Sequence, residues 1–151
     1  MSDAIKLDQY LPHTPPRVWR ALTDPDLLAR WLMPNDFQLK VGHRFTFQGT
    51  PMPKVNFSGI VQCEVLDFEI ERKLSFSWMD HSGENDLRST VTWRLEPEGQ
   101  GTHLFLEHDG FDFAHPLHQL SYQIMSPGWT RLMRQLVETL ASEEAVPTPN
   151  K

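Results

Sequence analysis

The chain has a single cysteine, Cys63, no cluster of basic residues and no long apolar run. One thiol cannot form an intramolecular disulfide, and it excludes zinc sites built from several thiolates. Fourteen basic against 20 acidic residues give a net charge of −6, which argues against binding a nucleic acid or an anionic membrane surface. No apolar stretch approaches the roughly 20 residues of a membrane-spanning helix. Without a secretory signal, these absences predict a soluble cytoplasmic protein.

Aromatic side chains, in contrast, are plentiful, with five tryptophans and nine phenylalanines in 151 residues. This length suits one domain with a sizeable core and is too short for two domains of ordinary size. We predict a single domain over residues 1–144. Residues 145–151, which include two prolines, are expected to form a frayed tail.

A cap residue followed by proline predicts the start of three helices. Thr14-Pro15 and Asp24-Pro25 open two short helices, and Ser126-Pro127 opens a last helix over residues 127–140. One side of this last helix is an apolar stripe that needs a sheet to cover it, formed by Trp129, Leu132, Met133, Leu136 and Leu140. Residues 112–125 have apolar positions that suit a short helix, but His115-Pro116 breaks that pattern.

Alternation of apolar and polar residues predicts strands over residues 5–11 and throughout residues 37–108. In the second region the apolar positions are Phe45 and Phe47; Val55, Phe57, Val61, Cys63 and Val65; Leu74, Phe76 and Trp78; Leu87, Val91, Trp93 and Leu95; and Leu104 and Leu106. Residues 96–101 are expected to form a turn, and longer connections are expected at residues 48–54 and 80–86. The predicted fold is α+β, with a curved antiparallel sheet of about six to seven strands around the last helix and two short helices after the first strand.

Several stretches resemble one protein family. Residues 16–25 and 28–31 are similar to its opening motif, residues 57–61 and 74–78 to its central strands, and residues 101–111 with Gly128-Trp129 to its closing strand and helix start. The family is the heat-shock protein 90 ATPase activator homologue type of the START-like superfamily, also called SRPBCC or polyketide cyclase-like. The similarity extends in the correct order from about residue 5 to residue 140, with one departure at Val41-Gly42-His43, where a second glycine is common.

The resemblance implies the helix-grip fold, in which a curved sheet holds a long C-terminal helix around a hydrophobic cavity. Family members and their neighbours include a co-chaperone domain, polyketide cyclases and small-molecule binders, so the fold alone does not select a function. Our first hypothesis is therefore a noncatalytic protein that binds a small hydrophobic ligand of aromatic, lipid or polyketide-like character. Residues 112–125 would form a lid over the cavity.

The candidate binding wall consists of side chains that should face the space between sheet and helix. Each aromatic ring alone is better explained as core filling, whereas the resemblance favours a cavity for the set as a whole. Ser89 and His108 would orient a polar group of the ligand. The full set is Trp31, Phe45, Phe47, Phe57, Phe76, Trp78, Ser89, Val91, Trp93, Leu106, His108, Phe111, Trp129 and Met133.

Catalysis and metal binding find less support in the residues. His108 and Ser89 should both face inward, but no carboxylate partner is visible for a triad, so a cyclase or hydrolase remains only a second alternative and no catalytic residue is predicted. His103 and His108 are five residues apart and should face opposite sides of the sheet. His115 and His118 are separated by Pro116 and lack a third ligand, so neither a metal site nor a cofactor is predicted.

The remaining alternative is a stress-related, co-chaperone-like module that modulates a heat-shock protein 90 ATPase. In the eukaryotic activators the stimulatory motif lies in a separate N-terminal domain, and no such segment precedes Ile5, so we do not expect that activity from this motif. Self-association through a sheet edge or an apolar patch would make a homodimer.

Overall fold

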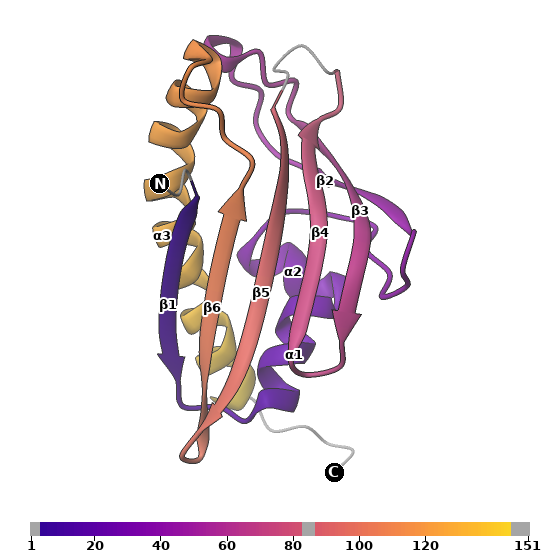
Figure 1. Ribbon diagram of the computed structural model, residues 1–151. Coiled ribbons are helices and arrows are strands. Elements are labelled where there is room, and N and C mark those ends of the chain that lie inside the picture. The colour runs from indigo at the N-terminus through magenta and orange to yellow at the C-terminus, as the bar shows by residue number, and fades with distance from the viewer. Residues whose placement is uncertain (1–3, 83–86, 146–151) are drawn as a thin grey trace.

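One sheet and the α-helices on one of its faces make up the protein (Figure 1), whose computed structural model describes residues 4–82 and 87–145. Six antiparallel strands lie in the order β1-β6-β5-β4-β3-β2. The elements are β1 (Ile5–Leu11), α1 (Pro15–Thr23), α2 (Pro25–Trp31), β2 (Arg44–Gln48), the 3₁₀ turn η1 (Pro53–Val55), β3 (Ile60–Glu69), β4 (Lys73–Asp80), β5 (Arg88–Glu98), β6 (Gly101–Asp109) and α3 (Pro116–Ala145). The predicted helix-grip architecture is confirmed.

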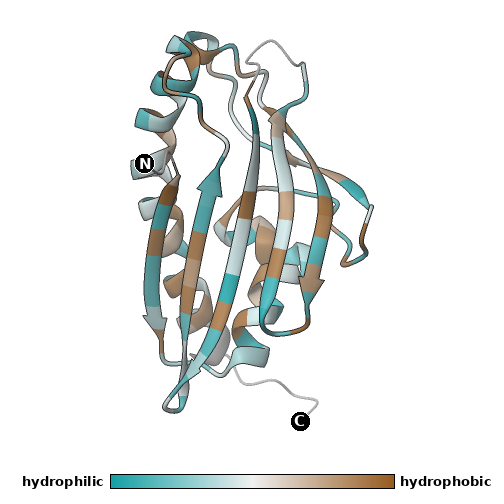
Figure 2. Ribbon diagram, viewed as in Figure 1, coloured by the Kyte–Doolittle hydropathy of each residue, from teal (hydrophilic) through white to brown (hydrophobic). Residues whose placement is uncertain are grey.

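Alternate positions of the strands point to an inner face, which the helices cover, and to an outer face (Figure 2). The register aligns inner-facing residues across the sheet, so that Val91 pairs with Phe76 on one side and His108 on the other. In the next row Trp93 pairs with Leu74 and Leu106. Burial of these rows against the helices forms the hydrophobic core.

The two short helices begin where the cap-plus-proline pattern predicts. Pro15 and Pro25 each occupy the first helical turn, and Asp24 ends α1 and caps α2 by accepting a hydrogen bond from the N–H of Asp26 at 2.9 Å. The indole N–H of Trp31 donates to the carbonyl oxygen of Ala21 at 2.9 Å, which holds α2 against α1. Both helices contact α3 on the inner face.

The predicted start of the last helix at Ser126-Pro127 is wrong, because α3 begins at Pro116 and continues through Pro127. Nδ1 of His115 accepts a hydrogen bond from the N–H of Leu117 at 3.2 Å, as a capping side chain does. Pro116 therefore stands at the first helical position and does not break a helix. Pro127 cannot donate a helical hydrogen bond to residue 123, yet packing on the sheet keeps the helix continuous.

The two halves of α3 differ in what they bury. After Pro127 the buried side chains are apolar and include Trp129, Met133, Leu136 and Leu140, as predicted. Between residues 116 and 126 only His118 and Ser121 are buried. The first half of α3 is therefore held by less apolar burial than the second.

Residues 55–57 do not belong to the strand that their apolar pattern predicts. Val55 ends η1, Phe57 makes only an isolated bridge to Met52, and β3 begins at Ile60. Asn56 and Gly59 have φ values of 55° and 97°, and these left-handed conformations interrupt an extended chain.

The ends of other predicted segments also shift. The turn at residues 96–101 is shorter than expected, because β5 extends to Glu98 and β6 starts at Gly101. Residues 83–86 of the connection 80–86, and residues 146–151 of the expected tail, lie outside the described residues. Ala145 is the last residue of α3. No helix among residues 4–82 and 87–145 is long and apolar enough to cross a membrane.

Candidate ligand-binding site

The structure brings the predicted wall residues together on the inner face of the sheet, beneath the helices. All are buried except Phe57, which is partly buried and packs against the cluster from the loop before β3. The ring centroids of Trp129 lie 5.6 Å from those of Trp78 and 5.8 Å from those of Trp93. Because these rings contact one another, a ligand can enter the layer only by displacing some of them.

A chain of hydrogen bonds runs through this aromatic layer. The indole Nε1 of Trp129 lies 2.9 Å from Nδ1 of His108, and Nε2 of His108 lies 2.8 Å from Oγ of Ser89. Oγ of Ser89 in turn donates to the carbonyl oxygen of Trp78 at 2.8 Å. The elements β4, β5, β6 and α3 each contribute one member, so the chain ties the helix to three strands.

The direction of each bond in the chain follows from its two ends. An indole nitrogen can only donate, so Nδ1 of His108 accepts and carries no proton. The carbonyl oxygen of Trp78 can only accept, so the Ser89 hydroxyl donates to it and accepts from Nε2–H of His108. Every donor and acceptor in the chain is satisfied when His108 is neutral.

Burial also keeps His108 neutral. The side chain is fully buried, and desolvation of its charged form lowers the pKa of His108 to about 3. In this arrangement the imidazole donates to Ser89 and so is not placed to remove the serine proton. The pair therefore lacks the geometry of an activated nucleophile.

Asp80 is a buried polar residue of the same region that the sequence analysis missed. It continues the inward-facing positions of β4, and this parity was the signal that could have identified it. Its Oδ1 accepts from the N–H and hydroxyl of Ser58 at 2.7 and 2.9 Å, and its Oδ2 accepts from the N–H of Ser82 at 2.9 Å and from the Ser82 hydroxyl. Desolvation opposes ionisation, but these hydrogen bonds prevail and lower the pKa of Asp80. Asp80 thus fastens the loop before β3 to the end of β4.

We predict that Asp80→Asn lowers the free energy of unfolding by about 2 kcal/mol, because the amide nitrogen cannot accept the bonds that one carboxylate oxygen accepts now. Urea unfolding at pH 7 measures the change. Asp67→Asn is the matched control, since Asp67 is exposed and makes only a surface ion pair with Lys73 at 3.4 Å, and it should change stability by less than about 1 kcal/mol. Equal losses of stability in the two variants would contradict the conclusion that Asp80 holds the loop before β3 to the end of β4.

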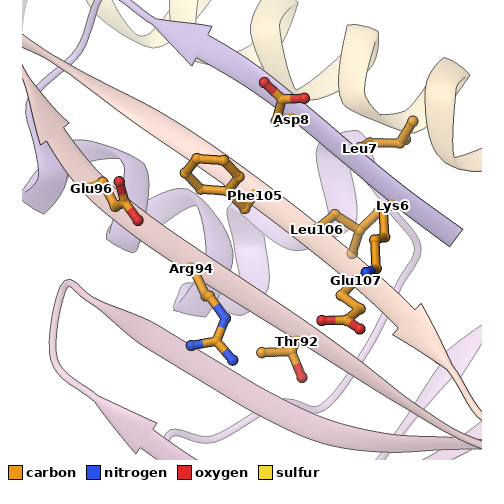
Figure 3. Close-up of a pocket in the computed structure, with 9 residues that line it drawn as sticks. All are labelled: Lys6, Leu7, Asp8, Thr92, Arg94, Glu96, Phe105, Leu106 and Glu107. Atoms are coloured by element: carbon orange, nitrogen blue, oxygen red, sulfur yellow. The ribbon is translucent and has the colours of Figure 1, made fainter. Parts of the chain in front are cut away.

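A hollow of about 290 Å³ lies on the outer face, away from the aromatic layer (Figure 3). Phe105 lies at its centre between charged side chains of both signs. The hollow is open, and of the predicted wall residues it includes only Leu106, so it is separate from the aromatic layer. Its lining consists of Lys6, Leu7, Asp8, Thr92, Arg94, Glu96, Phe105, Leu106 and Glu107.

The histidines lie on opposite faces of β6, as the alternation predicts. His103 faces outward, with Nε2 2.6 Å from Oδ2 of Asp8 and Nδ1 3.1 Å from Oε1 of Glu98. The hydrogen bonds to Asp8 and Glu98 raise the pKa of His103. His103 therefore favours the charged form, whereas His108 is held neutral.

The side chains considered for metal binding have other partners. The rings of His115 and His118 stack with centroids 4.4 Å apart, and Nδ1 of His118 accepts from the N–H of Asp112 at 3.0 Å. Burial raises the pKa of the Cys63 thiol, which keeps the sulfur protonated. Within the described residues, no three His, Cys, Asp or Glu side chains are grouped so that they could hold a metal ion.

Comparison with known proteins supports the fold and the family. The family model described as activator of Hsp90 ATPase homolog 1-like protein matches residues 12–141. Protein MLL2253 from Mesorhizobium loti is 36% identical, with 92% of this chain and 97% of that chain covered and a TM-score of 0.80. CalU16 from Micromonospora echinospora is 26% identical, with coverages of 94% and 78% and a TM-score of 0.72. DynU16, from the dynemicin biosynthetic locus, shares the fold at 18% identity, with coverages of 95% and 49% and a TM-score of 0.73. No curated protein matches the chain.

Proposed function

The chain belongs to the family of activator of Hsp90 ATPase homolog 1-like proteins, and from that premise we propose that it binds a small, mainly apolar ligand between the sheet and α3 without catalysing a reaction. The observation that carries the proposal is the hydrogen-bonded chain from Trp129 to Trp78 inside the aromatic layer. Small-molecule sites are typically apolar and aromatic, with a few polar groups at fixed positions.

The entry route is supported by the unequal burial of α3. In the first half of the helix, between residues 116 and 126, only His118 and Ser121 are buried, while Tyr122 and Met125 are partly buried against the core. The ring centroid of Tyr122 lies 5.3 Å from that of Phe111. Displacing this half exposes less apolar surface than displacing the second half. We therefore extend the expected lid, residues 112–125, to the proline at position 127.

The test is direct binding of small aromatic probes to the intact protein. Isothermal titration with a panel of bicyclic aromatic compounds should detect saturable binding of at least one member. Trp93→Leu should weaken that binding at least about tenfold, because a contacting ring is lost. Arg94→Leu, on the exposed side of the same strand, should change it by less than about twofold. No binding up to the solubility limit of every probe, or equal effects of the two variants, would overturn the proposal.

A protein partner is a second candidate function, favoured by the family description and by the outer hollow around Phe105. Aromatic residues are enriched in protein interfaces, and the rims of such interfaces are polar. The measurement is the ATPase rate of a heat-shock protein 90 chaperone with saturating amounts of this protein. An unchanged rate would remove this candidate, whereas Phe105→Ala should reduce any effect that is seen.

A further inference from the structure

We infer that the ligand class of the inner site is a neutral aromatic compound with a hydroxyl group, and that this hydroxyl inserts between Trp129 and His108. The inference rests on the proposed function and specifies its ligand. It follows from the direction of the hydrogen bonds in the buried chain and from the helix geometry around Trp129.

The hydrogen bond between Trp129 and His108 is the point where a ligand atom can be inserted and can bridge the two side chains. Nε1–H of Trp129 donates and Nδ1 of His108 accepts, at 2.9 Å. A hydroxyl oxygen placed between them accepts from the indole and donates its own proton to Nδ1, so both groups stay satisfied. The bonds from His108 to Ser89 and from Ser89 to Trp78 need not change.

Other polar groups fit this position less well. A carbonyl oxygen accepts from Trp129 but leaves Nδ1 of His108 without a donor in a buried place. A carboxylate adds a charge among rings, since Trp78, Phe111 and Trp129 surround the imidazole with centroids 5.4, 5.1 and 5.9 Å away. Burying an unpaired charge there is costly, so an anionic ligand is disfavoured.

The backbone before Trp129 is suited to the small outward shift that insertion requires. Pro127 donates no hydrogen bond to the preceding turn, and Gly128 has open space where a side chain would be. The helix after Trp129 stays anchored by Met133, Leu136 and Leu140. The ring of Trp129 can therefore move with the first half of α3 while Met133, Leu136 and Leu140 stay buried in the core.

Three matched probes test the inference on the unmodified protein at pH 7, namely naphthalene, 2-naphthol and 2-naphthoate, each measured by isothermal titration. We expect 2-naphthol to bind about three- to tenfold more tightly than naphthalene, as a net hydrogen bond provides. We expect 2-naphthoate to bind at least about tenfold more weakly than 2-naphthol.

Two variants assign the preference to the Trp129–His108 pair. Trp129→Phe alone would leave Nδ1 of His108 as an acceptor for the hydroxyl proton, so the informative change is Trp129→Phe combined with His108→Leu. This double variant keeps a ring but removes both partners of the hydroxyl, so the ratio between 2-naphthol and naphthalene should fall to about one. Trp93→Phe changes a ring that contacts Trp129 but is not part of the hydrogen-bonded chain, so the ratio should remain as in the unmodified protein.

The outcomes separate this inference from the proposed function. If naphthalene binds and 2-naphthol has no advantage, or if the advantage persists when both Trp129 and His108 are replaced, the inserted hydroxyl is wrong while apolar binding stands. If 2-naphthoate binds most tightly, the neutral ligand class is wrong. If none of the three probes binds, both the inference and the proposed inner site are overturned.

Discussion

Acidification from pH 6.5 towards pH 3 is expected to destabilise the fold by about 1.4 kcal/mol for each pH unit through His108 alone. The unfolded chain takes up a proton near pH 6.5, whereas burial lowers the pKa of His108 in the folded protein to about 3. The contribution of His108 is therefore fully present above pH 6.5 and is lost as the pH falls. The total loss approaches about 4 to 5 kcal/mol near pH 3.

Urea unfolding between pH 4.5 and pH 6.5 measures this effect, and His108→Gln is the informative variant. A glutamine can accept from Trp129 and donate to Ser89, but it does not titrate. The slope of unfolding free energy against pH should fall by the equivalent of about one proton in this variant, and Thr130→Ala, at an exposed position without a titratable group, should leave it unchanged. An unchanged slope in His108→Gln would show that His108 is not held neutral.

Two other groups, His103 and Asp80, contribute to the pH dependence of the stability outside this range. The hydrogen bonds to Asp8 and Glu98 raise the pKa of His103, so its stabilisation is present below about pH 6.5 and is lost as the pH rises through the raised pKa. The pKa of Asp80 is lowered from 3.8, so its stabilisation is lost only as the pH falls below that value. Measurements between pH 4.5 and pH 6.5 therefore isolate His108 from both groups.

Trp129→Ala is expected to lower the free energy of unfolding by about 3 to 5 kcal/mol. The substitution removes a buried ring that contacts Trp78 and Trp93, and it leaves Nδ1 of His108 without its donor. Trp129→Phe should cost less, because much of the ring volume remains. Urea unfolding at pH 7 measures both losses.

The neighbouring Thr130 provides the control for Trp129. Its side chain is exposed and its hydroxyl contacts only the carbonyl oxygen of Ser126, at 3.4 Å, so Thr130→Ala should change stability by less than about 0.5 kcal/mol. A loss below about 1 kcal/mol in Trp129→Ala would mean that Trp129 does not link α3 to the sheet.

Strand parity predicted most of the inner face correctly. It placed His108 with Leu104 and Leu106, and Ser89 with Val91 and Trp93, and all of these side chains are buried. It could not predict that His108 pairs with Trp129, because that contact depends on how α3 lies across the sheet. Strand parity could also have indicated that Asp80 faces inward. It could not have predicted that Ser58 and Ser82, which lie in loops, donate hydrogen bonds to Asp80.

The errors occurred where local signals compete with tertiary packing. Ser126-Pro127 has every local feature of a helix start. However, α3 already begins after the capping residue His115, and burial of Trp129 and Met133, which follow Pro127, keeps the helix continuous. Phe57 follows a strand-like pattern, but the left-handed Asn56 places it in a loop. Both errors concern the region that covers the inner site.

The central claim, that an apolar ligand binds between the sheet and α3, is tested most directly by the indole N–H resonances in a ¹H–¹⁵N NMR titration with 2-naphthol. The chain has five tryptophans, so five indole signals are expected, and Trp129→Phe identifies that of Trp129. We predict a saturable shift of the Trp129 signal, with little change at Trp19, which lies in α1. A Trp129 signal that stays unchanged while the probe is bound elsewhere on the protein would contradict the claim.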